Sequence, residues 1–340
     1  MNSIEKIVRP NILALQAYSS AREEFTGSKG LFLDANENPF GELNRYPDPL
    51  QKELKQKLSV IKEIAPQNIF TGNGSDEAID LCFRIFCEPG KDKALTFTPT
   101  YGMYEVSAAI NNTELIKVPL DDNFQIDKNK ALLALEDKNL KLVFICSPNN
   151  PTGNCLDAAE FIIQNFKGIV VVDEAYADFC STTLVNKLKQ YSNLIVLQTL
   201  SKAWGLAAAR VGIAYASPFI ISLFNKVKPP YNISKLNYTA AIKALENTNN
   251  YEEQKKLLLE ERQKLSEALS QIPIVRKVYP SQANFLLVEV SDANSVYQNL
   301  IQQGIIIRNR NKEVKNCIRI SIGTPQENKA LLNALQNITA

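Results

Sequence analysis

Short, continuously apolar segments recur through the middle of this 340-residue chain, and stretches with helical periodicity separate many of them. The five clearest candidate strands cover residues 94–97, 142–146, 169–172, 194–197 and 211–215. Strands that are apolar on both faces belong in a sheet covered on both sides, and helical crossovers connect parallel strands. We therefore predict an α/β fold whose large domain is a mostly parallel sheet flanked by helices.

The two ends of the chain depart from this central pattern. Residues 1–40 look irregular after a short segment at 4–15, and residues 46–65 have the apolar spacing of an amphipathic helix. After residue 250 a long charged helix at 251–270 precedes shorter candidate strands at 284–290, 304–308 and 317–322. We predict an N-terminal arm that includes part of the small domain (1–40), a large domain (41–250) and a small α+β C-terminal domain (251–340).

The sequence contains no histidine. Ser-His-Asp and Cys-His catalysis and all His-ligated metal sites are therefore excluded, and any acid–base group must be Lys, Asp, Glu, Tyr or Cys. The formal net charge is only +2, which argues against a nucleic-acid partner. We expect no metal site.

The six cysteines form no CxxC pair, and no apolar stretch has the length of a transmembrane helix. The first residues also lack the apolar core of a secretory signal. We expect reduced cysteines in a cytoplasmic protein without a membrane partner. The cysteines are Cys82, Cys87, Cys146, Cys155, Cys180 and Cys317.

Polar residues follow three successive candidate strands. Asn149, Asp173 and Lys202 lie at or just after the strand ends, separated by 24 and 29 residues, enough for helical crossovers. Ligands of parallel sheets bind outside the carboxyl ends of the strands, so these three side chains should line one rim. An amide, a carboxylate and a lysine amine meet the needs of a pyridoxal 5′-phosphate site.

A phosphate seat is predicted in the segment TGNGSDE at 71–77, where a glycine-rich turn opens a helix. Free backbone N–H groups and the positive end of the helix dipole favour an anion at Gly74, Ser75 and Asp76. The Asp76 carboxylate would repel phosphate, so we expect a mainly backbone contribution from this residue. Arg210 can bind phosphate through two N–H groups, and Tyr101 can stack on a cofactor ring.

The chain resembles fold-type I pyridoxal-phosphate aminotransferases over nearly its whole length. The resemblance rests on FTPTYGMY, CSPNNPTG, VVDEAYADF, LSKAWGLAAARVG, GIIIR and CIRISIGT. The segments LDANENPFG, NRYPDP and TGNGSDEAID make it similar to the family members that act on histidinol phosphate. One departure follows Tyr18, where many members have a Pro/Gly pair and this chain has Ser19-Ser20-Ala21-Arg22.

The resemblance implies a role for each matching residue. Lys202 would bind the cofactor as an imine and Asp173 would pair with the ring nitrogen, with Tyr176 as a further catalytic residue. Tyr176 and Asn149 would hydrogen-bond the ring oxygen, and Tyr101 would stack on the ring. The phosphate group would be held by Gly74, Ser75, Asp76, Thr199, Ser201 and Arg210, with Tyr46 reaching it from the other subunit of a homodimer. The substrate would meet Arg319, Arg308, Tyr18, Asn36 and Asn149.

The activity that the resemblance implies is transamination between histidinol phosphate and 2-oxoglutarate in histidine biosynthesis, giving imidazole acetol phosphate and glutamate. Two arginines suit this pair of substrates because a guanidinium accepts both phosphate and carboxylate. Two alternatives on the same scaffold stay open: an aromatic or broad-range amino-acid aminotransferase, and an O-phospho-amino-acid decarboxylase. A nicotinamide-dependent dehydrogenase is disfavoured because Glu77 stands where its third glycine is required. A non-catalytic sensor would need an output domain, for which residues 1–40 are too few.

Overall fold

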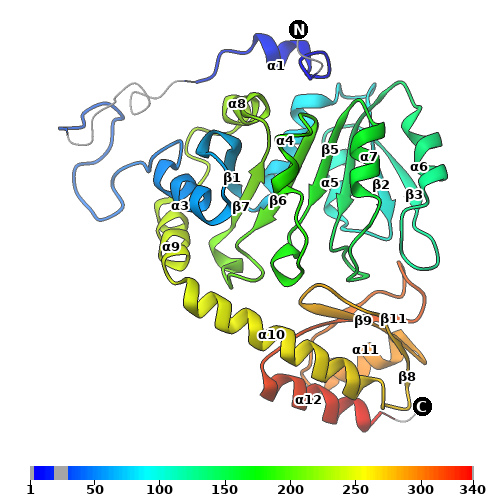
Figure 1. Cartoon of the computed structure of the whole chain (residues 1–340). Helices are drawn as coiled ribbons and strands as arrows, with labels where there is room; N and C mark the ends of the chain where they lie inside the picture. The colour runs from blue at the N-terminus through cyan, green and yellow to red at the C-terminus, as the bar shows by residue number, and fades with distance from the viewer. Residues whose placement is uncertain (1–3, 19–29, 339–340) are drawn as a thin grey trace.

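The structure is a computed structural model that describes residues 4–18 and 30–338 (Figure 1). It contains a seven-stranded sheet with helices on both faces and a smaller four-stranded sheet near the C-terminus. The predicted α/β class, with a mostly parallel sheet, is confirmed. The departure at Ser19 to Arg22 lies outside the described residues.

The large sheet has the strand order β1-β7-β6-β5-β4-β2-β3. The strands β3, β2, β4, β5 and β6 are parallel, whereas β7 is antiparallel to both β6 and β1. In chain order the strands are β1 (Ile69–Asn73), β2 (Lys93–Thr98), β3 (Glu114–Pro119), β4 (Leu140–Cys146), β5 (Ile169–Asp173), β6 (Leu194–Thr199) and β7 (Val211–Tyr215).

Two apolar layers cover the two faces of this sheet because alternate residues of each strand point to opposite sides. In β5, Val170 and Val172 belong to one buried cluster and Ile169 and Val171 to the other. One layer is built from α3 (Lys52–Lys62), α6 (Lys128–Leu135), α7 (Ala159–Asn165) and α9 (Lys235–Glu246). The opposite layer uses α1 (Pro10–Ala14), α4 (Ser75–Phe86), α5 (Met103–Ile110) and α8 (Pro218–Val227). We call this assembly the large unit.

The C-terminal unit is a separate antiparallel sheet backed by helices. Its strand order is β10-β11-β9-β8, and α10 (Thr248–Leu269) runs to it from the large unit (Figure 1). Leucine and isoleucine side chains from the sheet and from α10, α11 and α12 form its own core. The other elements are β8 (Val275–Val278), β9 (Phe285–Val290), α11 (Ala293–Gln302), β10 (Arg308–Asn309), β11 (Cys317–Ser321) and α12 (Pro325–Gln336).

Four elements differ from the sequence-based expectations. The predicted helix 46–65 begins only at Lys52, because Asp48 accepts hydrogen bonds from the backbone N–H groups of Leu50 and Lys52 before the helix starts. The strands β1 and β3 were not expected: β1 ends in the glycine-rich segment that reads as a turn, and β3 is an edge strand with a mixed burial pattern. β7 is antiparallel rather than part of the parallel set.

The N-terminal segment packs on the large unit. Ile4, Val8 and Ile12 are buried in the same cluster as α4 and α8, so residues 4–14 pack on the large unit and not on the small domain. The rest of the predicted domain division stays a prediction. Within the described residues, no helix is both long and apolar enough to cross a lipid bilayer.

Candidate active site

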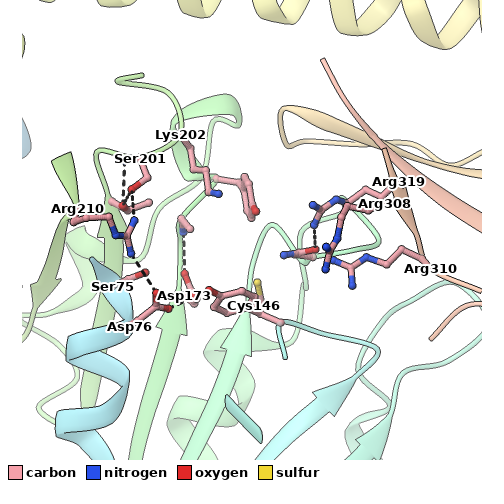
Figure 2. Close-up of a pocket in the computed structure, with 15 residues that line it drawn as sticks. Ser75, Asp76, Cys146, Asp173, Ser201, Lys202, Arg210, Arg308, Arg310 and Arg319 are labelled. Atoms are coloured by element: carbon pink, nitrogen blue, oxygen red, sulfur yellow. Dashed lines mark hydrogen bonds and ion pairs between the residues drawn. The ribbon is translucent and has the colours of Figure 1, made fainter. Parts of the chain in front are cut away.

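A cavity of about 400 Å³ opens where the carboxyl ends of β4, β5 and β6 face the C-terminal unit (Figure 2). Most of its walls come from loops that follow the parallel strands, and β10 and its neighbours close one end. The residues that line it are Ser75, Asp76, Tyr101, Cys146, Asn150, Asp173, Ala175, Tyr176, Thr199, Ser201, Lys202, Arg210, Arg308, Arg310 and Arg319.

A buried carboxylate lies at the floor of this cavity. Asp173 is the last residue of β5 and pairs in register with Cys146 of β4. Its Oδ2 accepts a hydrogen bond from the Tyr104 hydroxyl at 2.8 Å, and its Oδ1 accepts one from the Ala175 N–H at 3.1 Å. Burial raises the pKa of Asp173 to about 6, although both hydrogen bonds act in the opposite direction. A cationic N–H donor in the cavity would stabilise the charged form.

The lysine side chain enters the cavity from the loop after β6. Lys202 Nζ lies 5.5 Å from the centre of the Tyr176 ring. Burial lowers the pKa of Lys202, and the positive charge of Arg319 lowers it further, whereas Asp173 raises it. A lysine with a lowered pKa is more often neutral, which is the form that attacks a carbonyl carbon.

The predicted phosphate seat forms at the start of α4. Gly74 precedes the helix with φ +76°, no side chain caps the helix, and the Gly74 N–H donates to the Arg210 carbonyl at 2.8 Å. A Cβ at Gly74 would lie 2.5 Å from Arg210 Nη2, so only glycine lets the guanidinium approach this turn. The Ser201 hydroxyl accepts hydrogen bonds from Thr199 Oγ1 at 2.9 Å and Arg210 Nη1 at 3.5 Å. A helix N-terminus, a guanidinium and hydroxyl groups fit a phosphate group.

The Asp76 carboxylate has its own partners in the seat. It accepts a hydrogen bond from the Tyr101 hydroxyl at 3.0 Å and lies 3.4 Å from Arg210 Nη2. These contacts hold the carboxylate to the side of the helix terminus, which leaves the Asp76 backbone N–H as its natural contribution to the seat. Tyr101 also packs edge-to-face on Tyr104 at 5.7 Å between ring centres.

The structure places Asn150, and not the predicted Asn149, in the wall of the cavity. The Asn149 side chain is fully buried and bonded to protein: its Nδ2 donates to the Pro99 carbonyl and Thr152, and its Oδ1 accepts from Thr100. Asn150 lines the cavity instead, and its Oδ1 accepts a hydrogen bond from Arg319 Nη1 at 2.5 Å. This bond turns the Asn150 amide so that its Nδ2 is the available donor. The cofactor and substrate roles predicted for Asn149 are therefore wrong, and Asn150 is the candidate for both.

Three guanidinium groups meet at the end of the cavity away from Arg210 (Figure 2). Arg308 of β10 is directly opposite Arg319 of β11 in the antiparallel register. Like charges at opposed positions destabilise a sheet. Among the described residues, no carboxylate forms an ion pair with either of them, whereas Arg310 pairs with Glu313 at 3.2 Å.

Two donors of this arginine group have no partner. The Nε atoms of Arg310 and Arg319 are buried and make no hydrogen bond. Burial lowers the pKa of Arg319, and the neighbouring charges of Arg310 and Arg308 lower it further. Buried polar groups in native proteins are nearly always bonded, so these donors point to an anionic ligand at this end.

Three predicted residues lie away from this cavity. Tyr46 and Asn36 line a second cavity of about 570 Å³, in which the Tyr46 ring stacks on Tyr231 at 4.4 Å between centres. Tyr18 is 71% exposed and lines neither cavity. One chain therefore does not bring these three residues to Lys202, and their roles stay predictions.

The sequence reasoning missed four residues at the site: Cys146, Tyr104, Asn150 and Arg310. Arg310 could have been predicted from the sequence, because it is two residues from Arg308 and alternate residues of a strand share a face. Cys146 and Tyr104 reach the site only through the β4–β5 register and a contact with Asp173, neither of which the sequence displays.

Comparisons with known proteins agree with this geometry. The family model "Aminotransferase class I and II" matches residues 24–335. A histidinol-phosphate aminotransferase of Parabacteroides distasonis is 50% identical, and the match covers 99% of each chain; that of Cytophaga hutchinsonii is also 50% identical, over 98% of this chain and 99% of its own. A crystal structure of histidinol-phosphate aminotransferase from Sinorhizobium meliloti in complex with pyridoxal-5′-phosphate is 28% identical, with a TM-score of 0.80 and 89% of both chains covered.

Proposed function

The chain belongs to the class I and II aminotransferases, and within them to the histidinol-phosphate aminotransferases, and from this we infer that it moves an amino group between histidinol phosphate and 2-oxoglutarate. The products are imidazole acetol phosphate and glutamate, and the cofactor is pyridoxal 5′-phosphate. The observation that carries the proposal is one cavity with Lys202 and Asp173 at the sheet edge, a phosphate seat on one side and three arginines on the other.

The residues present fit this cofactor. Its phosphate group would lie at the start of α4, against Arg210, Ser201, Thr199 and the N–H groups of residues 75 and 76. The Asp173 carboxylate would accept a hydrogen bond from the protonated pyridine nitrogen, and Tyr176 and Asn150 Nδ2 would hydrogen-bond the ring oxygen. When bound, the cofactor supplies an aldehyde that condenses with amines and a ring that accepts electrons from a deprotonated carbon.

Lys202 performs the proton transfers in this proposal. Its amine would bind the cofactor aldehyde, and once the substrate amine has taken its place, the freed Lys202 amine would remove the proton from the substrate carbon that carries nitrogen. Lys202 would return a proton at the carbon of the former aldehyde. Water would then cleave the bond between the substrate carbon and nitrogen, releasing the keto product and leaving the amino group on the cofactor. The chain contains no imidazole, and Lys202 is the lysine that lines the cavity. Asp173 assists because its charge keeps the ring nitrogen protonated.

The arginines would bind the anionic end of each substrate. We assign the phosphate of histidinol phosphate to Arg308, Arg310 and Arg319, because the unpaired Nε donors of Arg310 and Arg319 require an acceptor. Arg308 and Arg319 also suit the second carboxylate of glutamate. This carboxylate carries one negative charge, whereas the phosphate of histidinol phosphate carries nearly two. Binding of an anion would offset the repulsion between the opposed Arg308 and Arg319.

A homodimer is part of this proposal. Tyr46 lies in a separate cavity of its own chain, so it would reach the cofactor phosphate of the partner subunit. Large apolar side chains that precede it in the sequence are strongly exposed, including Leu31, Leu33 and Phe40 at 82% or more. Such surface marks a protein interface. Sedimentation equilibrium should give twice the chain mass, and a monomer that retains full activity would exclude the shared site.

We place the reaction in the cytoplasm, in keeping with six free cysteines.

The activity test measures glutamate produced from histidinol phosphate and 2-oxoglutarate. Lys202→Ala should lower the rate by at least about 100-fold, the lower end of what a positioned acid–base group contributes. Lys256→Ala is the matched control, because the Lys256 side chain is 79% exposed on α10 and the variant should keep the wild-type rate. An unimpaired Lys202→Ala variant would refute the assignment. Carbon dioxide release from an O-phospho amino acid, without glutamate formation, would select the decarboxylase instead.

A further inference from the structure

Two cysteines that the proposed mechanism does not use lie together at the edge of the large unit. Cys155 follows the loop after β4, and Cys180 follows the short helix after β5. Both are partly exposed, whereas the other four cysteines are buried. Both sulfur atoms lie near one hydroxyl group: Cys155 Sγ is 3.9 Å and Cys180 Sγ is 3.7 Å from Thr182 Oγ1.

We propose that Cys155 and Cys180 are a reversible dithiol–disulfide site, oxidised by peroxides. The pair is placed for this chemistry because two side chains from different loops converge on the Thr182 hydroxyl without a covalent bond between them. Disulfides that form in reducing compartments are usually transient and redox-sensing or catalytic rather than structural.

The two thiols are electrostatically unequal. Hydrogen bonding from Cys155 lowers the pKa of Cys180 most strongly, and the Thr182 backbone and hydroxyl lower it further, whereas burial and the Asp178 carboxylate raise it. The same hydrogen bond with Cys180 raises the pKa of Cys155. The guanidinium of Arg262 on α10 is a nearby positive charge that favours the Cys180 thiolate. We assign Cys180 as the attacking sulfur and Cys155 as the thiol that resolves the product. In the structure Cys180 Sγ also donates to the Ala177 and Thr182 carbonyl oxygens at 3.4 Å, and deprotonation breaks these two bonds.

The reaction balances with hydrogen peroxide as the oxidant. The Cys180 thiolate attacks one peroxide oxygen, the O–O bond breaks, and Cys180 sulfenic acid and hydroxide form. The Cys155 sulfur then attacks Cys180 Sγ, the S–S bond forms, and the sulfenic oxygen leaves as water. The protein loses two electrons and two protons, and the peroxide becomes two water molecules.

The disulfide would tie together two loops that carry active-site residues. The loop of Cys155 also bears Asn150, and the segment of Cys180 follows Tyr176. Cys155 is in addition held to the C-terminal unit, since its N–H donates to Gln282 Oε1 at 2.9 Å and the Gln282 N–H donates to the Gly153 carbonyl at 2.7 Å. Oxidation would thus act at the junction of the two units beside the cavity.

The test uses the reduced, full-length protein with one equivalent of hydrogen peroxide under native conditions. Peptide mass spectrometry without reductant should find Cys155 linked to Cys180 within one chain, and denatured protein should have lost two of its six thiols. Dithiothreitol should restore both thiols. Linkage between chains, or first oxidation at another cysteine, would overturn the proposal.

Serine variants test the order of attack. Cys155→Ser should stop at a Cys180 sulfenic acid that dimedone captures, and Cys180→Ser should leave Cys155 reduced over the same period. Cys317→Ser, at a buried cysteine of the C-terminal unit, is the matched control and should form the cross-link at the wild-type rate. Between pH 7.5 and 6.5 the oxidation rate of an ordinary thiol falls about tenfold, whereas that of Cys180 should fall less than about threefold. Equal oxidation of Cys180→Ser and wild type would refute the assignment of the attacking thiolate.

Discussion

Replacement of Arg310 by glutamine should weaken the binding of histidinol phosphate by about 10- to 100-fold and that of glutamate by less than about threefold. The Arg310 side chain is 16% exposed, its Nε is buried without a partner, and one arm of its fork is 3.2 Å from Glu313. A hydrogen bond to a charged group contributes about 1.5–3 kcal/mol, and each 1.4 kcal/mol is a tenfold change in affinity. Loss of one such bond to the phosphate gives the expected range, whereas the glutamate carboxylate keeps Arg308 and Arg319.

The assay is a titration of the visible absorption of the cofactor-loaded protein with each amino donor separately. Lys312→Gln is the matched control, because it removes the same charge from the same segment at a residue that does not line the cavity. Glu313→Gln provides the opposite change: it frees the second arm of Arg310 and should tighten histidinol phosphate binding. An equal loss of affinity for both donors in Arg310→Gln, or a loss of the same size in Lys312→Gln, would refute the assignment of Arg310 to the phosphate.

Two further variants test the cofactor seat and the lysine. Gly74→Ala places a Cβ 2.5 Å from Arg210 Nη2, so the guanidinium must move away from the seat. Because a hydrogen bond to a charged group contributes about 1.5–3 kcal/mol, the dissociation constant of pyridoxal phosphate should rise by at least about tenfold. Gly102→Ala, where a Cβ has no neighbour within 4 Å, should bind the cofactor normally, and unchanged affinity in Gly74→Ala would remove the seat from that turn. Lys202 attacks the cofactor as a neutral amine, and its pKa is lowered by burial and by Arg319, so incorporation into the cofactor-free protein should be half-maximal at a lower pH than for an ordinary lysine. Arg319→Gln removes a positive charge, raises the pKa of Lys202 and should shift this pH profile upward; a downward shift would contradict the sign of the effect.

The sequence was sufficient to predict the parallel core of the fold and the rim on which the site lies. Each central strand is an unbroken apolar run. A polar residue that follows such a strand therefore lies at the edge of the sheet, where its side chain can leave the apolar core. Asp173 and Lys202 follow that rule, so they were found without any knowledge of side-chain contacts. The phosphate seat was readable for a similar reason, since a glycine-rich turn before a helix leaves backbone N–H groups free.

The remaining features depend on tertiary contacts that leave little trace in the sequence. Adjacent asparagines follow β4, and only the fold decides that Asn149 bonds to Pro99 and Thr152 while Asn150 meets Arg319. The edge strand β1 contains Gly72 and pairs with β7, 138 residues away in the Asn73 to Val211 pair, so local periodicity could not reveal it. The approach of Cys155 to Cys180 has the same origin, because it results from the side-by-side placement of β4 and β5.

The most direct test of the proposed activity is a comparison of histidinol phosphate with phenylalanine as donors in the first half-reaction. Purified protein loaded with pyridoxal phosphate should lose its visible absorption at low concentrations of histidinol phosphate and regain it when 2-oxoglutarate is added. Phenylalanine should act only at much higher concentrations, since its single carboxylate does not need three arginines. If phenylalanine bleaches the absorption and histidinol phosphate does not, the arginine group has been given the wrong ligand and the substrate belongs to the aromatic amino acids.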